Sequence, residues 1–137
     1  MKDLIQCSLL IYSETSSSEQ ITAILGIQPS QTVEKGAPIH CSKERHSKKN
    51  GWFLVLECDY ISEIDITLQK LLNICLEKKK ELSLINDVEV NIRCHISSEY
   101  GQLGYELSKE TISALAKIGV GLQITIFSYG GVEYSCD

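Results

Sequence analysis

The residues of this chain that could do chemistry include three histidines and six cysteines. His40, Cys41 and His46 fall together in the polar stretch HCSKERHSKK, and imidazole and thiolate are common ligands of zinc. No fourth ligand accompanies them, and no two cysteines have the C-x-x-C spacing of a zinc or redox site. We therefore expect neither a metal site nor a cofactor.

Enzyme chemistry needs a nucleophile, a base and an orienting group that meet in one concave site. His95 is the only histidine on a predicted regular element, and Arg93 shares its face two residues away. The G-x-S-x-G, H-E-x-x-H and phosphate-binding glycine patterns are absent from the sequence. We expect a protein that is not an enzyme.

Four other cysteines occupy apolar positions of the elements that must build the core. Cys7, Cys58 and Cys94 fall on the apolar faces of three predicted strands, and Cys75 falls on the apolar stripe of a predicted helix. A free cysteine in such a place acts as a small hydrophobic residue. The sequence therefore predicts a structural role for all four.

Alternation of apolar and polar residues predicts the strands, most clearly in VEVNIRCHI. The dipeptide Asn50-Gly51 predicts a tight hairpin turn just before one of them. The predicted strands cover residues 4–12, 52–59, 88–96 and 121–129, with a weaker extended segment over 32–39.

Start and stop signals predict the helices between these strands. Ser16 and Glu19 have the spacing of a capping box, and Ser62 and Ser108 are predicted to cap the other two helices. Gly26 ends the first helix. The predicted helices cover residues 17–25, 62 to the lysine run 78–80, and 109–118.

The order β-α-β-β-α-β-α-β in 137 residues predicts one α+β domain spanning residues 1–137. A ferredoxin-like sandwich, with a mainly antiparallel sheet and helices on one face, is the simplest architecture for this order. The sheet face opposite the helices then becomes a candidate binding surface, because aromatic residues and Arg are enriched in interface hot spots. We name this set the open-face residues: Tyr12, Phe53, Arg93, His95, Phe127 and Tyr129.

The formal net charge of −5 argues against nucleic acid as the main partner, because such binding draws on a basic surface. A basic protein partner fits the charge better, although solubility alone also explains it. The opening MKDLIQCSLLIYS is broken by Asp3 and Gln6, and no apolar run approaches the length of a membrane span. We expect no membrane contact, and a reducing cytoplasm in which the cysteines stay free.

Three blocks of the sequence, in this order and spacing, resemble the bacterial family of domains of unknown function DUF4279. The blocks are SSEQITAILGIQPSQTVEKGAP, NGWFLVLECD and LSKETISALAKIGVGLQITIF. The resemblance covers nearly the whole chain and implies a small α+β domain that is plausible as an immunity or interaction protein. It supplies no catalytic residue.

We therefore expect a non-enzymatic cytoplasmic binding protein, in its most concrete form an immunity protein that neutralises a bacterial toxin by direct binding. A set of acidic residues then forms the hypothetical surface for a basic toxin domain: Glu57, Asp59, Glu63 and Asp65. A homodimer formed through the open sheet faces is an equal alternative to a foreign protein. A further alternative is a small-ligand or regulatory module, with the ligand near Lys35 and Trp52.

Overall fold

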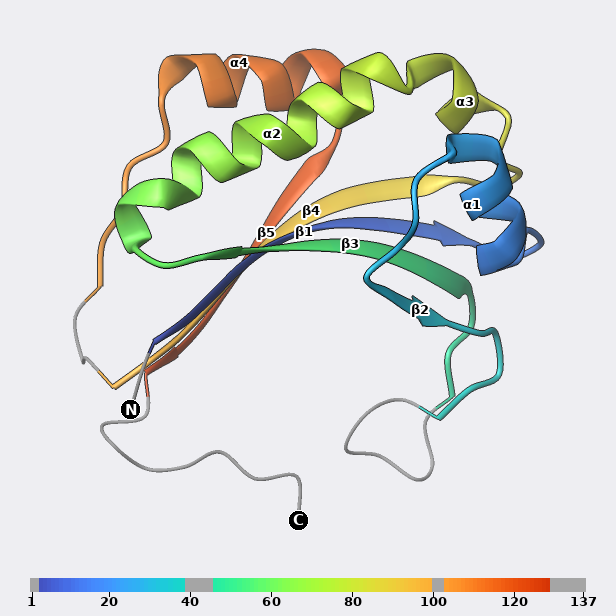
Figure 1. Cartoon of the computed structure of the whole chain (residues 1–137), viewed down its shortest axis with the longest axis horizontal. Helices are drawn as coiled ribbons and strands as arrows, with labels where there is room; N and C mark the ends of the chain where they lie inside the picture. The colour runs from blue at the N-terminus through green and yellow to red at the C-terminus, as the bar shows by residue number, and fades with distance from the viewer. Residues whose placement is uncertain (1–2, 39–45, 100–102, 129–137) are drawn as a thin grey trace.

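The computed structural model describes residues 3–38, 46–99 and 103–128, which form two layers (Figure 1). Helices lie together on one side of a curved sheet, and the strands bend away from them at both ends. In chain order the elements are β1 (Leu4–Ser13), α1 (Ser18–Leu25), β2 (Gln31–Val33), β3 (Asn50–Cys58), the 3₁₀ turn η1 (Ile61–Glu63), α2 (Ile64–Glu77), α3 (Lys79–Ser83), β4 (Glu89–Ser98), α4 (Lys109–Ile118) and β5 (Gly121–Ser128).

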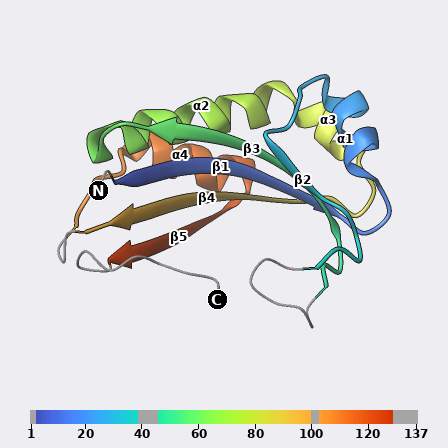
Figure 2. The same cartoon turned by 60° about the horizontal axis from the view of Figure 1, so that its bottom comes forward.

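The sheet has five strands in the order β2-β3-β1-β4-β5 (Figure 2). The pairs β2–β3, β3–β1 and β1–β4 are antiparallel, whereas β4 and β5 are parallel and joined through α4. This confirms the α+β class with a mixed sheet. The ferredoxin-like topology is not confirmed, because β4 and β5 pair in parallel and the order of the five strands in the sheet differs from that topology.

Two of the three predicted helices begin and end where capping chemistry places them. The first capping box is one residue later than predicted: Ser17 accepts from the Gln20 N–H, and Gln20 accepts from the Ser17 N–H. Ser16 does not begin the capping box, because a capping box would need its N–H to donate to the Glu19 side chain. This N–H instead donates to Ser13 Oγ at 2.9 Å. Ser108 caps α4 as predicted, and Gly26 and Gly119 end α1 and α4 with positive φ.

The long helix differs from its prediction at both ends. Ser62 lies within η1 and caps nothing; instead, the Glu63 carboxylate accepts hydrogen bonds from the N–H groups of Asp59 and Tyr60 at 3.1 and 2.8 Å. Helix α2 ends at Glu77, so the lysine run lies at the α2–α3 junction. The predicted apolar stripe is buried as expected: Ile64, Leu68, Leu71, Leu72 and Cys75.

Asn50-Gly51 does not form the predicted hairpin turn, since both residues are already part of β3 and pair with Ser13 and Tyr12. The Asn50 side chain is buried and joins three segments of the chain. Its Oδ1 accepts from the Lys35 N–H at 2.8 Å, and its Nδ2 donates to the Ser16 carbonyl at 2.9 Å. These two bonds fix the start of β3 against the loops that precede α1 and follow β2.

The core lies between the sheet and the helices. Alternate residues of β1, β3 and β4 enter it, and Trp52 is its largest fully buried side chain. The Trp52 indole packs under α1 and donates from Nε1 to Thr22 Oγ1 at 3.1 Å. No helix in the described part of the chain combines the length and apolarity needed to cross a membrane.

Asn50→Ala should lower the free energy of unfolding by about 2 kcal/mol, because it leaves the buried Ser16 carbonyl and the partly buried Lys35 N–H without their partner. Urea denaturation followed by circular dichroism measures this loss. The matched control is Asn73→Ala, which removes an exposed side chain on α2. An equal loss in the two variants would contradict the joining role of Asn50.

Candidate functional site

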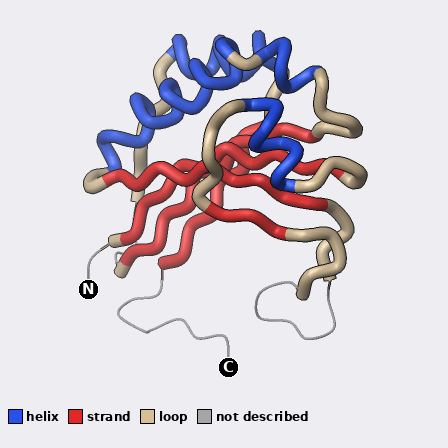
Figure 3. Tube along the Cα trace, turned by 45° about the vertical axis from the view of Figure 1, so that its right-hand side comes forward, coloured by secondary structure: helices blue, strands red, loops and turns tan. Residues whose placement is uncertain are grey.

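Figure 3 shows the strands in red with the helices in blue on the other side of the sheet. The face opposite the helices carries side chains from all five described strands. The structure places Tyr12, Phe53, Arg93, His95 and Phe127 on this face, in agreement with the alternation of the sequence. Tyr129, the remaining open-face residue, lies outside the described residues. The sequence therefore identified a set of side chains that share one surface, and their binding role stays a prediction.

The middle of this face is a hollow of about 330 Å³. Leu10 and Ser8 of β1 are only 4% and 8% exposed, although no helix covers them, because the sheet curves around them. The side chains that line the hollow are Gln6, Ser8, Leu10, Gln31, Phe53, Val55, Arg93, His95, Thr125 and Phe127. The floor has polar groups beside apolar ones, which is the composition of a recognition surface.

Three floor residues, Gln6, Ser8 and Leu10, were missed by the sequence reasoning. They occupy the same face of β1 as Tyr12, so the alternation of that strand contained the signal. They were overlooked because two of them are polar and the third resembles a core residue. Their central position follows from the sheet order, which puts β1 between β3 and β4.

Aromatic contacts hold the walls of the hollow in place. Tyr12 and Phe53 meet edge to face with ring centroids 5.5 Å apart, and His95 and Phe127 meet in the same way at 5.7 Å. The Phe53 ring lies over Gly51, where a Cβ atom would approach a ring carbon to 2.6 Å. Glycine at this position therefore gives the Phe53 ring the space it occupies.

The polar side chains of the hollow are oriented by neighbours on β5. Arg93 Nε donates to Gln123 Oε1 at 3.0 Å, and His95 Nδ1 lies 2.7 Å from Thr125 Oγ1. Burial, and then the positive charge of Arg93, lower the pKa of His95 below its usual range. The surface thus combines one fixed cation with an imidazole that is neutral at pH 7.

The oriented groups of the hollow are a guanidinium, an imidazole and the Thr125 hydroxyl, which lies beside the His95 ring. Within the described ranges, no group of three or more His, Cys, Asp or Glu residues could hold a metal ion. His40 and Cys41 lie outside those ranges, and His46 Nδ1 lies 3.1 Å from the Gly36 carbonyl oxygen.

The four acidic residues proposed as a partner surface do not share one environment. Glu57 is exposed on the open side of β3, whereas Asp65 lies on α2, on the helix side. The Asp65 carboxylate accepts from the Ser108 N–H at 2.8 Å and from Gln69 Nε2 at 3.2 Å. The Glu63 carboxylate accepts hydrogen bonds from the N–H groups of Asp59 and Tyr60. Asp65 and Glu63 therefore have structural hydrogen bonds to maintain.

The predicted core cysteines are buried and free. Cys7 of β1 and Cys94 of β4 stand directly opposite each other, and Cys58 donates to Thr67 Oγ1 at 3.3 Å. The hydrogen bond to Cys94, together with burial, raises the pKa of the Cys7 thiol far above its usual range. Burial also raises the pKa of Cys75 to about 11. The Cys7 and Cys75 thiols are therefore neutral at pH 7, as apolar packing requires.

Comparison with protein-family models gives a match over most of the chain. A family model described as Domain of unknown function (DUF4279) matches residues 3–129, which include every described strand and helix. No curated protein and no solved structure matches the chain.

The hydrogen bonds to Asp65 predict how stability depends on pH. Desolvation opposes ionisation, but the Ser108 N–H and the neighbouring side chains outweigh it and lower the pKa of Asp65. A carboxyl group whose pKa is lower in the folded state stabilises the fold above its unfolded pKa, and this stabilisation disappears as the pH falls through the folded pKa. Asp65→Asn should therefore reduce stability near neutral pH and reduce the loss of stability below about pH 4.

Urea midpoints at about pH 6 and about pH 3 measure this difference. Glu77→Gln, an exposed carboxylate on the same helix, is the control. If Asp65→Asn kept the wild-type difference between the two midpoints, the proposed linkage would be wrong.

The buried thiols should also be protected from modification. In native buffer, Cys7, Cys58 and Cys94 should react with iodoacetamide far more slowly than in guanidinium, because the folded chain covers their side chains. Mass spectrometry of the digested protein gives the rate for each cysteine. Equal rates for Cys7 under native and denaturing conditions would contradict its burial.

Proposed function

We propose a binding function for this chain, which belongs to the family of domains of unknown function DUF4279. The observation that carries the proposal is the uncovered, curved sheet face, on which Phe53, Phe127 and Arg93 border a hollow with an almost buried floor. Aromatic and Arg side chains around a partly desolvated centre are typical of interface hot spots. The partner is a protein, and the function requires no catalysis and no cofactor.

An immunity protein is the most concrete form of this function. Such a protein would cover the active surface of a toxin and work in the cytoplasm. The net charge of −5 supports a basic toxin domain as the partner, because opposite charges raise the association rate. Glu57 is the acidic residue best placed for this purpose, since it is exposed on the open side of β3.

We also propose that a ferredoxin-like arrangement describes the part of the chain from β1 to β4. The antiparallel order β2-β3-β1-β4, with α1 and α2 as connections, supports this description. Helix α4 and β5 then extend that unit on one side. Because β5 supplies Thr125 and Phe127, this extension completes the hollow.

Arg93→Ala and Phe127→Ala should each weaken the complex with a toxin encoded beside this gene by about tenfold, a hot-spot effect of about 1.4 kcal/mol. Isothermal titration calorimetry with the purified toxin measures the change. Ile66→Ala is the control, since Ile66 is an exposed apolar residue on α2, away from the open face.

Three outcomes would overturn the foreign-partner proposal. The first is that no complex forms with the toxin encoded beside this gene. The second is that Ile66→Ala weakens the complex as much as Arg93→Ala and Phe127→Ala do. The third is a chain that light scattering finds dimeric and that Phe127→Ala makes monomeric. That result would assign the open face to a homodimer.

A further inference from the structure

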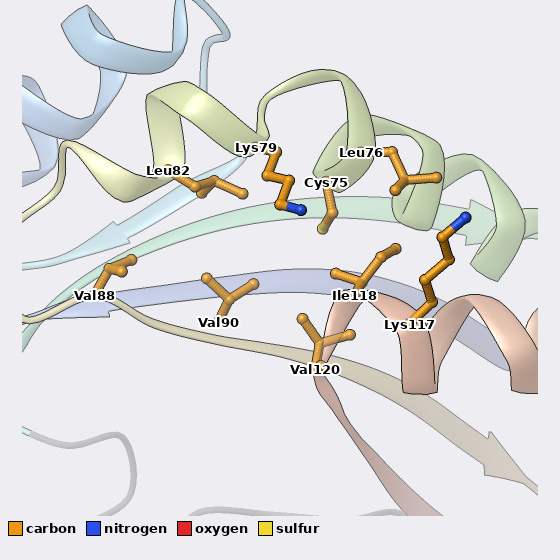
Figure 4. A pocket seen from close by; sticks show the side chains of 10 residues that line it. Cys75, Leu76, Lys79, Leu82, Val88, Val90, Lys117, Ile118 and Val120 are labelled. Carbon is orange, nitrogen blue, oxygen red and sulfur yellow. The ribbon is translucent and has the colours of Figure 1, made fainter.

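A second hollow, of about 300 Å³, lies on the helix side of the molecule, where α2, α3 and α4 approach the start of β4 (Figure 4). Pockets that bind small molecules begin at about this volume, whereas packing gaps inside proteins are rarely larger than a water molecule. The hollow is therefore large enough for a ligand. It is separated from the open face by the sheet itself.

The wall of this cavity is apolar. Its aliphatic side chains come from elements far apart in the sequence and point toward one another in Figure 4. They are Leu76, Leu82, Val88, Val90, Ile118 and Val120. Cys75, which is 2% exposed, closes the floor, and Leu76, which is 46% exposed, stands at the mouth. An apolar ligand that lies against these aliphatic side chains removes their surface from water, which favours binding.

Two charged residues line the cavity, and both are cations. Lys79 comes from α3 and extends toward Cys75, whereas Lys117 comes from α4 and extends past Ile118 to the side of Leu76 (Figure 4). Neither ammonium group has an ion pair or hydrogen bond with any described residue. No aspartate or glutamate lines the cavity. The mouth therefore carries positive charge that the protein does not neutralise locally.

Helix ends explain part of this pattern. Lys117 lies in the last turn of α4 and Lys79 follows the end of α2, where cations interact favourably with helix dipoles. That interaction accounts for a lysine near each helix end. It does not account for the aliphatic side chains that line the hollow beside the two lysines, because a solvated lysine needs no such neighbour.

We propose that this cavity binds an apolar monocarboxylate of the medium-chain fatty acid type. The hydrocarbon chain lies against Val88, Val90 and Val120, and the carboxylate lies at the mouth between Lys79 and Lys117. Burial of its methylene groups removes apolar surface from water, so the hydrocarbon chain provides most of the affinity. The two lysines select the anion over a neutral molecule of the same shape.

The test uses sodium decanoate below its micelle concentration, with decanol and decylamine as the neutral and cationic comparisons. Decanoate should shift the amide resonances of Val90 and Val120 in a saturable way in two-dimensional NMR spectra, and decanol and decylamine should bind more weakly. Lys79→Gln and Lys117→Gln should each raise the Kd for decanoate about threefold, the effect of an exposed ion pair.

Lys80→Gln is the matched control. It removes the same charge from the same helix as Lys79→Gln, but Lys80 does not line the cavity. Val90→Phe should fill the cavity and abolish the shifts. Any one of three results would overturn the proposal: no saturable shift with decanoate, equal Kd values for decanoate and decanol, or an effect of Lys80→Gln equal to that of Lys79→Gln.

This site and the proposed protein interface are tested separately. Phe127→Ala, on the opposite face of the sheet, should leave the Kd for decanoate unchanged. Failure of protein binding together with normal decanoate binding would contradict only the proposal for the open face. Normal protein binding without decanoate binding would contradict only the proposal for the cavity.

Discussion

In the described part of the chain, helices cover only one side of the sheet, and most features of the molecule depend on that constraint. Each central strand must send one row of side chains into the core and leave the other row to meet solvent or a partner. In β4 this separates the fully buried Ile92, Cys94 and Ile96 from Arg93 and His95. Both hollows follow from this separation: one lies on the uncovered face, and the other lies where the helix layer does not fill the space above β4.

The strands and their faces were predictable because the period of two in a strand is carried by the residue types themselves. VEVNIRCHI predicts which residues are buried without any reference to the rest of the chain. The parallel pair β4–β5 was not predictable in this way. It depends on which edge of the sheet α4 returns to, and no local pattern encodes that choice.

Local signals failed where longer-range contacts compete with them. Asn50-Gly51 is a strong hairpin signal, but the Asn50 amide binds Lys35 and Ser16, which keeps these residues within β3. Ser16 has suitable spacing for a cap, but Ser13 already holds its N–H. The cavity beside Lys79 and Lys117 could not be predicted from the sequence either, because the residues around it come from several distant segments.

The position of Trp52 determines what its fluorescence can report. The chain has one tryptophan, and its indole is fully buried under α1 and bonded to Thr22. Trp52 lines neither hollow, so emission from this ring is a direct signal of how closely α1 sits on the sheet. The intrinsic fluorescence of Trp52 can therefore report how α1 docks on the sheet and can follow partial opening of the helix layer without any added label.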